Sequence, residues 1–298
     1  MDNYIQNRYD FVFLYDVKDG NPNGDPEMDN QPRIDFETRE GLVSDVCIKR
    51  KVRNYVHLKV EEGKLEASKY DIFISQGKPL NAKIKEGKEK AKGNEEKGRI
   101  VMCERYYDIR TFGAVLSTGE KDESGKKGVG AVRGPVQFVF SRSIDAIDSK
   151  THSLTRCCKV DDADSTTFGN KSTVSYGLYR MHGYVSAFDG IKCHFTEKDL
   201  DLLWDALMNA FEHDHSAARG EMNARALIIF KHDSKLGEAR SSELFKLVEI
   251  EKVKDENGET IQFPRQFEDY MVTINGKELS PIEDYTKIQD GIAMKVLI

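Results

Sequence analysis

The sequence lacks the features typical of membrane proteins and of secreted, disulfide-bonded proteins. No apolar run reaches the ~18 residues that a membrane-spanning helix needs, and the first residues, MDNYIQNRYD, contain no apolar signal-peptide core. The chain has five cysteines, which is an odd number, and their spacing is not that of a metal site. They are Cys47, Cys103, Cys157, Cys158 and Cys193. We therefore expect a cytoplasmic protein with free thiols, no membrane association and no bound metal.

The chain also lacks the short motifs that mark common enzymes. It contains no GxSxG nucleophile turn, no HExxH zinc motif and no paired-carboxylate motif. The segment DGNPNGDP has neither the Gly-Lys-Ser/Thr ending of a P-loop nor the spacing of a dinucleotide-binding loop. We therefore predict no catalytic residues and no cofactor.

Negative charge is unevenly distributed along the chain. The net charge is −6 at pH 7, and residues 238–290 alone contain 13 acidic and 7 basic side chains. The rest of the chain is therefore neutral overall, with local basic clusters. This distribution fits a protein with one basic groove for a polyanion, and it fits many unrelated enzymes as well.

Hydrophobic periodicity predicts alternating strands and helices. The expected strands are residues 8–17, 131–142, 176–188, 224–231, 245–250, 270–274 and 293–298, and the expected helices are 45–60, 102–116 and 196–213. Ser44 or Asp45 can cap the first helix and Thr196 the last. The order strand, helix, strand, strand, helix, strand is typical of the split βαβ, ferredoxin-like plan, which is an α+β fold.

Two polar segments interrupt this plan. Residues 61–99 are rich in Lys and Glu and poor in apolar residues, which indicates a helical, solvent-facing insertion, and a Gly-rich tip follows at residues 117–130. Residues 143–175 are turn-rich and weakly hydrophobic, which is typical of an extended arm or a long hairpin.

The first predicted helix carries a cationic face. Lys49, Arg53 and His57 recur at intervals of four residues and therefore share one side of the helix, with Arg50 and Lys51 beside them. Such a face can neutralise the phosphates of a nucleic acid. The alternative is an ordinary solvated helix face.

The loop before this helix has the composition of an anion-binding turn. Exposed backbone amides in DGNPNGDP, together with Asn21, Asn23 and Gly24, can hold a phosphate. A tight surface turn explains the same residues, and on chemistry alone it is the simpler interpretation.

The segment AVRGPVQFVF begins like the sheet signature of an RNA recognition motif. Arg133 and Gly134 match that signature, but Pro135 and Val136 stand where an aromatic and a small residue are required. Bases are therefore not expected to stack on this sheet in the usual way, and the nucleic-acid backbone is expected to be held instead.

Residues 167–185 mix cations with aromatic side chains. Lys171, Arg180 and His182 lie among Phe168 and two tyrosines. This combination suits single-stranded nucleic acid, because bases stack on rings while phosphates pair with cations. An ordinary amphipathic strand accounts for the pattern equally well.

The segment FEHDHSAARGE raises the alternative of metal or acid–base chemistry. His213, Asp214 and His215 are adjacent, but two helical residues spaced i, i+2 point to different sides, and no third ligand has matching spacing. A helix C-terminal cap with surface charge is the favoured interpretation. The rival hypothesis is a metal-dependent endoribonuclease that uses these three residues.

Several ordered motifs resemble one known family. DGNPNGDP, VSDVCIKRKVRNYV, RTFGAVLS, VRGPVQFVFSRSID, YGLYRMHGYV and FEHDHSAARGEM, in this order, resemble the backbone subunit of the type I-C CRISPR Cascade complex (Cas seven-type, the Csd group of the RAMP superfamily). The resemblance runs from about residue 8 to residue 247. It departs at residues 235–246, which differ from the family's apolar-Pro pattern.

The resemblance implies a hand-like subunit with a modified ferredoxin-like or RRM palm, a helical fingers insertion and a long thumb hairpin. The implied ranges are 1–60 (first palm strand, loop and basic helix), 61–130 (fingers), 131–146 (palm strand), 147–175 (thumb), 176–235 (palm) and 236–298 (acidic C-terminal strands completing the palm).

The resemblance also implies a non-catalytic role in antiviral defence. Copies of the subunit would form a helical oligomer along the spacer of a CRISPR RNA and present it for pairing with target DNA. The other implied partners are the guide-processing cap subunit, the large subunit and the small subunit. The residues predicted to bind RNA, from the patterns above and from the quoted motifs, are Asn21, Asn23, Gly24, Lys49, Arg50, Arg53, Arg110, Arg133, Arg142, Lys171, Arg180 and His182.

Overall fold

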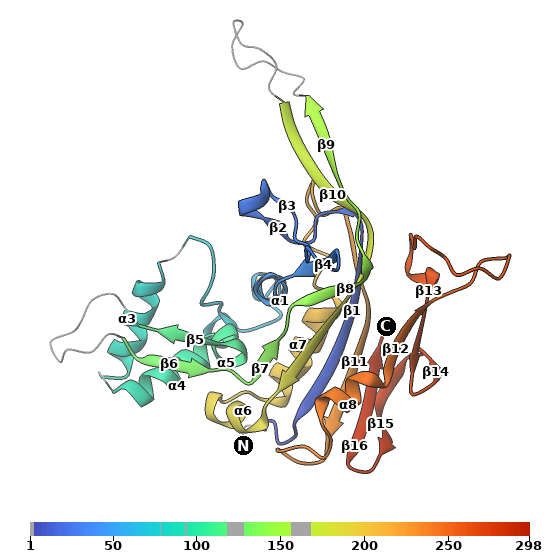
Figure 1. The fold of residues 1–298 in the computed structure, drawn as a ribbon. Helices are drawn as coiled ribbons and strands as arrows, with labels where there is room; N and C mark the ends of the chain where they lie inside the picture. Colours follow the sequence, from blue (N-terminus) through green and yellow to red (C-terminus); the bar gives the residue numbers. More distant parts are fainter. Residues whose placement is uncertain (1–2, 78, 93, 118–127, 156–167) are drawn as a thin grey trace, which may run out of the picture.

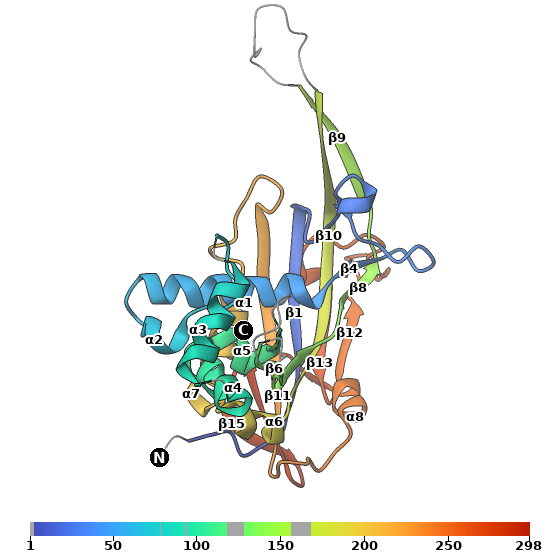
Figure 2. The same cartoon turned by 90° about the vertical axis from the view of Figure 1, so that its left-hand side faces the viewer.

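A computed structural model describes residues 3–77, 79–92, 94–117, 128–155 and 168–298 of the chain. The architecture is mixed α+β. Figures 1 and 2 show a long, twisted sheet with most of the helices on one side and a smaller sheet with a short helix on the other side. Among the described residues, no helix is both long enough and apolar enough to cross a membrane.

The central sheet is antiparallel and, within the described residues, has nine strands. Seven of them follow one another across the sheet in the order β15 (Ile282–Gln289), β16 (Ile292–Leu297), β11 (Glu221–His232), β1 (Tyr9–Gly20), β10 (Phe168–Val185), β8 (Ser141–Ala146) and β4 (Glu40–Val43). The other two, β7 (Val136–Phe138) and β9 (Ser149–Thr155), pair with β10 at its two ends.

The topology confirms the predicted split βαβ plan. β1 is antiparallel to both β10 and β11, and β10 is antiparallel to β8. It follows that β1 and β8 run parallel with β10 between them, and that α1 (Asp45–Glu61) lies in the connection between these two strands. In the same way β10 and β11 run parallel on either side of β1, and α7 (Glu197–Met208) lies in their connection.

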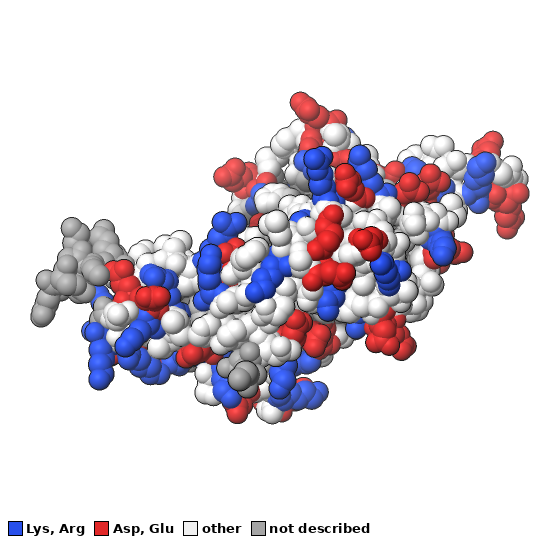
Figure 3. Space-filling model, turned by 90° about the horizontal axis from the view of Figure 1, so that it is seen from below, with Lys and Arg blue, Asp and Glu red and all other residues white. Residues whose placement is uncertain are grey.

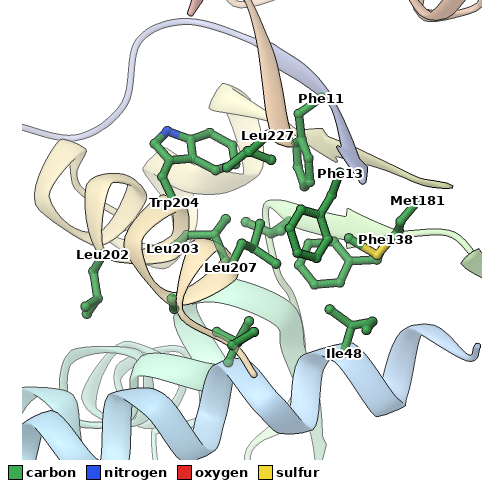
Figure 4. Packing of buried hydrophobic residues seen from close by; sticks show 14 of the residues in the cluster. Phe11, Phe13, Ile48, Phe138, Met181, Leu202, Leu203, Trp204, Leu207 and Leu227 are labelled. Atoms are coloured by element: carbon green, nitrogen blue, oxygen red, sulfur yellow. The ribbon is translucent and has the colours of Figure 1, made fainter. Parts of the chain in front are cut away.

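β1 is buried on both faces, which explains its almost continuous apolar sequence. Phe11 and Phe13 pack toward α1 and α7, while Val12 and Leu14 pack into a second core on the opposite side. Figure 4 shows Phe11 and Phe13 against Trp204 and neighbouring leucines of α7, with Ile48 of α1 nearby. Because both sides of the central strand are covered, it offers no open face on which bases could stack.

The two main helices begin where the sequence predicts. Thr196 and Asp199 form a capping box at the start of α7, which ends at Met208 rather than at residue 213. Ser44 precedes α1, but its hydroxyl does not cap the helix. Val52 and Val56 of α1 are buried as expected, whereas Val46 is 63% exposed and does not belong to the apolar face.

The insertion expected from residue 61 onward is mainly helical in its described part and has a small core of its own. Its helices are α2 (Ala67–Tyr70), α3 (Leu80–Lys90), α4 (Glu95–Arg105) and α5 (Tyr107–Phe112), and its strands β5 (Gly113–Leu116) and β6 (Gly130–Arg133) form a hairpin-like pair. The expectation that residues 61–99 face solvent is wrong in part, because Phe73 and Ile84 pack with Met102 in a buried cluster.

The single helix expected at residues 102–116 and the single strand expected at 131–142 are both wrong. Tyr106 is extended and Gly113 has φ +79°, so the helix breaks twice and ends in β5. A Cβ on Gly134 would lie 2.2 Å from the Gly113 backbone nitrogen, so this close approach requires glycine and interrupts the strand. The strand is therefore divided into β6, β7 and β8.

The arm expected at residues 143–175 is wrong at its start, because residues 143–146 belong to β8 of the central sheet. The rest of its described part is a pair of antiparallel strands, as in a hairpin. β9 pairs with residues 168–174 of β10, and the two project from the body in Figure 1. Residues 156–167, with Cys157 and Cys158, and most of the tip predicted at 117–130 lie outside the described residues. Cys47, Cys103 and Cys193 are free thiols, as expected.

The acidic C-terminal region forms the second layer and one edge of the central sheet. α8 (Ser241–Lys246) is followed by a small sheet of β12 (Val248–Lys252), β13 (Tyr270–Ile274) and β14 (Lys277–Glu278). The strand predicted at residues 270–274 is confirmed as β13, and the strand predicted at 293–298 is confirmed as β16. The strand predicted at 245–250 begins later, at Val248, and forms β12. The sequence did not predict three elements, which are α6 (Ala187–Cys193), α8 and β15. The remaining short elements are β2 (Gly24–Asp25), β3 (Gln31–Pro32) and 3-10 turns at Pro26–Met28 and Phe267–Asp269.

Candidate nucleic-acid interface

Three segments that are far apart in the sequence meet at the first turns of α1. They are the loop after β1, α1 itself and the irregular segment at residues 209–220 after α7. Together they surround a cavity of about 310 Å³, which we call the α1 pocket, lined by Asn23, Ser44, Val46, Cys47, Arg50, Lys51, Asn54, Asp214 and Arg219. In Figures 1 and 2 the first residues of α1 lie near the β2–β3 turn, and β3 contacts the β9–β10 hairpin.

The loop predicted to bind an anion is fixed to the start of α1. Asn23 Oδ1 accepts hydrogen bonds from the Ser44 backbone N–H and from the Ser44 hydroxyl, both at 2.9 Å. Asn21 is buried and its side-chain amide donates to the Asn30 carbonyl at 2.7 Å. A Cβ on Gly24 would lie 1.9 Å from Asn30 Oδ1, so a larger residue there would displace the Asn30 side chain. Asn21 and Gly24 thus shape the loop, and Asn23 reaches the pocket.

The α1 pocket carries three cations and, among its lining residues, one carboxylate. Arg50 is exposed and makes no ion pair with the described residues. Lys51 forms an ion pair with Asp214, and Arg219 Nε lies 2.9 Å from the same carboxylate oxygen. Burial raises the pKa of the Cys47 thiol, so the thiol is neutral at pH 7. The pocket therefore has an excess of positive charge.

Two other cations of α1, Lys49 and Arg53, face the body of the protein. Lys49 and Arg53 share one face, as their spacing predicts, but that face packs on Phe112, with ring distances of 5.6 and 5.3 Å. Arg53 Nε is also 2.8 Å from Asp108 Oδ2 in a buried ion pair, and Lys49 pairs with Asp45 at 2.8 Å. These two cations are therefore already neutralised by carboxylates of the chain.

Arg110 lies inside the protein, at the contact between the insertion and α7. Its guanidinium donates to Asp199 Oδ1 through Nε at 3.0 Å and through a terminal nitrogen at 2.7 Å, and both side chains are buried. It also donates to the carbonyls of Lys69 and Cys103. All of these partners are internal, and the structure presents no charge of Arg110 to the solvent.

A second cavity, of about 860 Å³, brings three of the predicted residues together. Arg142, Arg180 and His182 line it with residues of α8 and β12, and we call it the sheet pocket. Arg180 donates to the Val248 and Phe245 carbonyls, and Arg142 pairs with acidic side chains at 2.8 and 2.9 Å. His182 stacks on Phe245 at 4.1 Å, and burial together with Arg180 lowers the pKa of His182 to about 4. The histidine is therefore neutral at pH 7.

Arg133 and Lys171 lie apart from both pockets. The Arg133 side chain is exposed on β6, 3.4 Å from Asp189. Lys171 is on the projecting hairpin, opposite His152. On the face shown in Figure 3, basic and acidic side chains are intermingled, so the surface charge there alternates in sign. The predicted residues thus divide into four groups. Two line the α1 pocket (Asn23 and Arg50), three line the sheet pocket (Arg142, Arg180 and His182), three are in ion pairs with Asp45, Asp108 and Asp199 (Lys49, Arg53 and Arg110), and the other four lie in the loop (Asn21 and Gly24) or at separate surface positions (Arg133 and Lys171).

The histidines considered for metal binding do not form a metal site in the described part of the chain. No group of three potential ligands occurs there. Asp214 is bound by Lys51 and Arg219, His213 is exposed, and a ring nitrogen of His215 lies 3.1 Å from the Gly220 carbonyl.

Sequence reasoning gave too little weight to two residues of the α1 pocket. The sequence pattern places Lys51 only beside the cationic face, and it does not single out Arg219. Their common partner is Asp214, which is 163 positions away from Lys51 in the chain. The motif FEHDHSAARGEM contains both Asp214 and Arg219 and was the one signal that pointed to this segment.

Comparison with known proteins finds a curated relative and distantly similar solved structures. A CRISPR-associated protein Cas7 of Haloferax volcanii is 25% identical over 229 residues, which are 68% of this chain and 65% of that protein, so the chain spans about two thirds of its relative. Two solved structures show distant similarity. A "CRISPR RNA-guided surveillance complex" matches with TM-score 0.44 and 14% identity over 75% of this chain and 68% of the other. A type III-B Cmr-beta complex bound to cognate target RNA matches with TM-score 0.41 and 12% identity over 75% of this chain and 61% of the other.

The family assignment rests on a match that covers most of the sequence. The profile of the family described as "CRISPR-associated protein Cas7" matches residues 7–275. This range includes the central strands β1, β10 and β11, both main helices and every residue that lines the α1 pocket. The chain belongs to the Cas7 family of CRISPR-associated proteins.

Proposed function

We propose that this protein is an RNA-holding backbone subunit of a CRISPR surveillance complex and that the α1 pocket binds a phosphate of the guide RNA. Family membership supports the first part of the proposal. The second part rests on one observation, the convergence of Arg50, Lys51 and Arg219 around a cavity of about 310 Å³. Cations in such a pocket contact phosphates without reading sequence, which leaves base edges free for pairing with a target strand.

We also propose a division into palm, fingers and thumb, which the arrangement of the central sheet, the insertion and the hairpin supports. The palm is the central sheet with α1, α7 and the C-terminal layer, the fingers are residues 61–130, and the thumb is the hairpin within 147–175. We propose that copies of the subunit stack along the guide and contact the cap, large and small subunits of a type I-C complex. The ordered sequence motifs support this subtype, and the proposed role requires no catalysis, cofactor or metal.

The contacts described above support a revised proposal for the side chains that hold RNA. Arg50 and Arg219 are the first choices, with Lys51 and Asn23 beside them. Arg142, with its side chain 53% exposed, Arg133 and Lys171 remain candidates for secondary phosphate contacts. Arg53, Arg110 and Arg180 are engaged internally and are assigned to maintaining the fold.

The test replaces Arg50 and Arg219 by alanine and measures binding of fluorescent guide RNA by anisotropy. We expect a weaker affinity and a shallower salt dependence, with the slope of log K against log salt reduced by about 0.7 for each phosphate that the variant fails to neutralise. The decrease in affinity should be the same for guides of unrelated sequence.

The matched control replaces Arg240 and Arg265, two exposed arginines outside the α1 pocket, and removes the same charge. Equal decreases in both double variants, or a decrease that depends on guide sequence, would contradict the proposed site. Metal-dependent RNA cleavage that His213→Ala abolishes would instead support the ribonuclease alternative.

A further inference from the structure

The carboxylate of the α1 pocket is the feature that the proposed function leaves unexplained. A pocket that binds phosphate has no evident need for a negative charge. Asp214 nevertheless lies between Lys51 and Arg219 and contacts both through the same oxygen, Oδ2. A role for Asp214 in regulating this pocket rests on the proposed function, because it presupposes that the pocket binds RNA.

The arrangement is more than a surface ion pair. The Lys51 side chain is only 3% exposed and Asp214 is 16% exposed, whereas Arg219 is 37% exposed. The Lys51 ammonium also lies 5.5 Å from the centre of the Phe211 ring. An ammonium in such surroundings is costly without an anionic partner, because its charge is poorly hydrated. The free protein therefore needs an anion at this position.

A carboxylate and a phosphodiester present equivalent chemistry to these two cations. Each carries a single negative charge at neutral pH and offers oxygen acceptors to N–H donors. Arg50, on the same cavity, has no such partner among the described residues and stays available. The pocket thus contains one open cation and two that are occupied by a group resembling the proposed ligand.

Asp214 is placed where it can give up this role. It belongs to the segment between α7 and β11, in neither a helix nor a strand, and the segment turns back through hydrogen bonds between Ser216 and Arg219. A rotation of its side chain would release Oδ2 without breaking a ladder of the sheet. The Asp214 backbone N–H donates to the Phe211 carbonyl at 3.1 Å, so the main chain can stay in place during that rotation.

We propose that Asp214 is an internal substitute for an RNA phosphate, which neutralises Lys51 and Arg219 in the free protein and competes with the guide RNA for them. The pocket then binds a phosphate only when Arg50 and further contacts along the RNA help to displace the carboxylate. Short or isolated polyanions, which engage the α1 pocket alone, are held weakly.

The test is the affinity of Asp214→Asn for guide RNA. Competition predicts tighter binding by about fivefold, equivalent to about 1 kcal/mol, and a salt slope that is steeper by about 0.7 for one added phosphate contact. If Asp214 merely positions Lys51 and Arg219 for RNA, the same variant binds more weakly. Weaker or unchanged binding would overturn the proposal.

Two controls keep the result interpretable. Asp284→Asn changes the net charge equally at an exposed position far from the pocket in sequence, and it should leave the affinity at the level of the unmodified protein. A failure of Asp214→Asn to fold, because Lys51 loses its partner, calls for a second comparison. In that case the double variant Lys51→Met, Asp214→Asn is compared with Lys51→Met alone. Competition predicts that the double variant binds guide RNA more tightly than the single variant.

The outcome also distinguishes failure of the competition from failure of the proposed function. If Arg50→Ala with Arg219→Ala leaves RNA binding intact, the α1 pocket is not the RNA site and both ideas fail. If that double variant loses RNA binding while Asp214→Asn does not gain it, the RNA site stands and only the competition by Asp214 is refuted.

Discussion

Replacing Arg110 by methionine separates two roles that this arginine could have. Its place in a family motif predicts an RNA contact, whereas the structure shows its guanidinium between α7 and the insertion. Methionine keeps most of the length and apolar contact of the side chain and removes the charge and the five donors. We expect a large loss of stability and, while the protein stays folded, an unchanged affinity for guide RNA.

The magnitude follows from the contacts that remain. Removing one partner of a buried ion pair costs about 3–5 kcal/mol, because the other charge is left without compensation. Asp199 would keep two partners on its second oxygen, the Thr196 backbone N–H at 2.9 Å and the Thr196 hydroxyl at 2.8 Å. We therefore expect the lower end, about 3 kcal/mol, which corresponds to a decrease of roughly 5–10 °C in Tm.

Urea unfolding followed by circular dichroism measures the stability, and fluorescence anisotropy well below the unfolding midpoint measures RNA binding. Arg105→Met is the control, because Arg105 pairs with Glu86 and Asp71 at a more exposed position, with its side chain 32% exposed. A variant of normal stability that has lost RNA affinity would refute our reasoning and assign Arg110 to the RNA site after all.

The sheet pocket and the projecting hairpin can be tested in the same way. Burial lowers the pKa of His182 to about 4 from its usual 6.5, so the unfolded state takes up the proton first and stability is lost as the pH falls from about 6.5 to about 4. His182→Gln should reduce this pH dependence of stability, measured as urea midpoints at pH 7 and pH 4.5. The same pH dependence in both proteins would contradict the argument. Replacing residues 150–172 by a short Gly-Ser linker should leave a folded monomer that no longer assembles on guide RNA in size-exclusion chromatography with light scattering, and normal assembly would refute the thumb assignment.

Strong periodic signals explain why the central fold could be predicted. The apolar run of β1, the capping box of α7 and the buried-type sequence of β11 each specify one local structure, and their order allows few topologies. The insertion was harder, because Tyr106 and Gly113 end local elements through contacts that no short window of sequence reveals. Strand β15 was missed because its residues are mostly exposed and give no clear alternation.

The site was predictable only in outline, for a physical reason. The sequence identifies cations near an amide-rich loop, but it does not say which carboxylates lie opposite them. Arg53 meets Asp108, 55 positions away, and Lys51 meets Asp214, 163 positions away. Whether an arginine binds a ligand or a neighbouring helix is decided by these distant partners, and therefore by the tertiary structure.

The length of β10 couples two parts of the molecule mechanically. Its 18 residues pass from the projecting hairpin into the central sheet without a break, and Val174 pairs with Ser149 on one side and with Gly20 of β1 on the other. The direction of the hairpin is therefore set by the twist of the central sheet, because both share β10. A force on the outer end of the hairpin would act as shear along β1, next to the loop that shapes the α1 pocket. In the proposed assembly, a contact made by the hairpin would therefore be coupled to the proposed RNA site through β10 and β1.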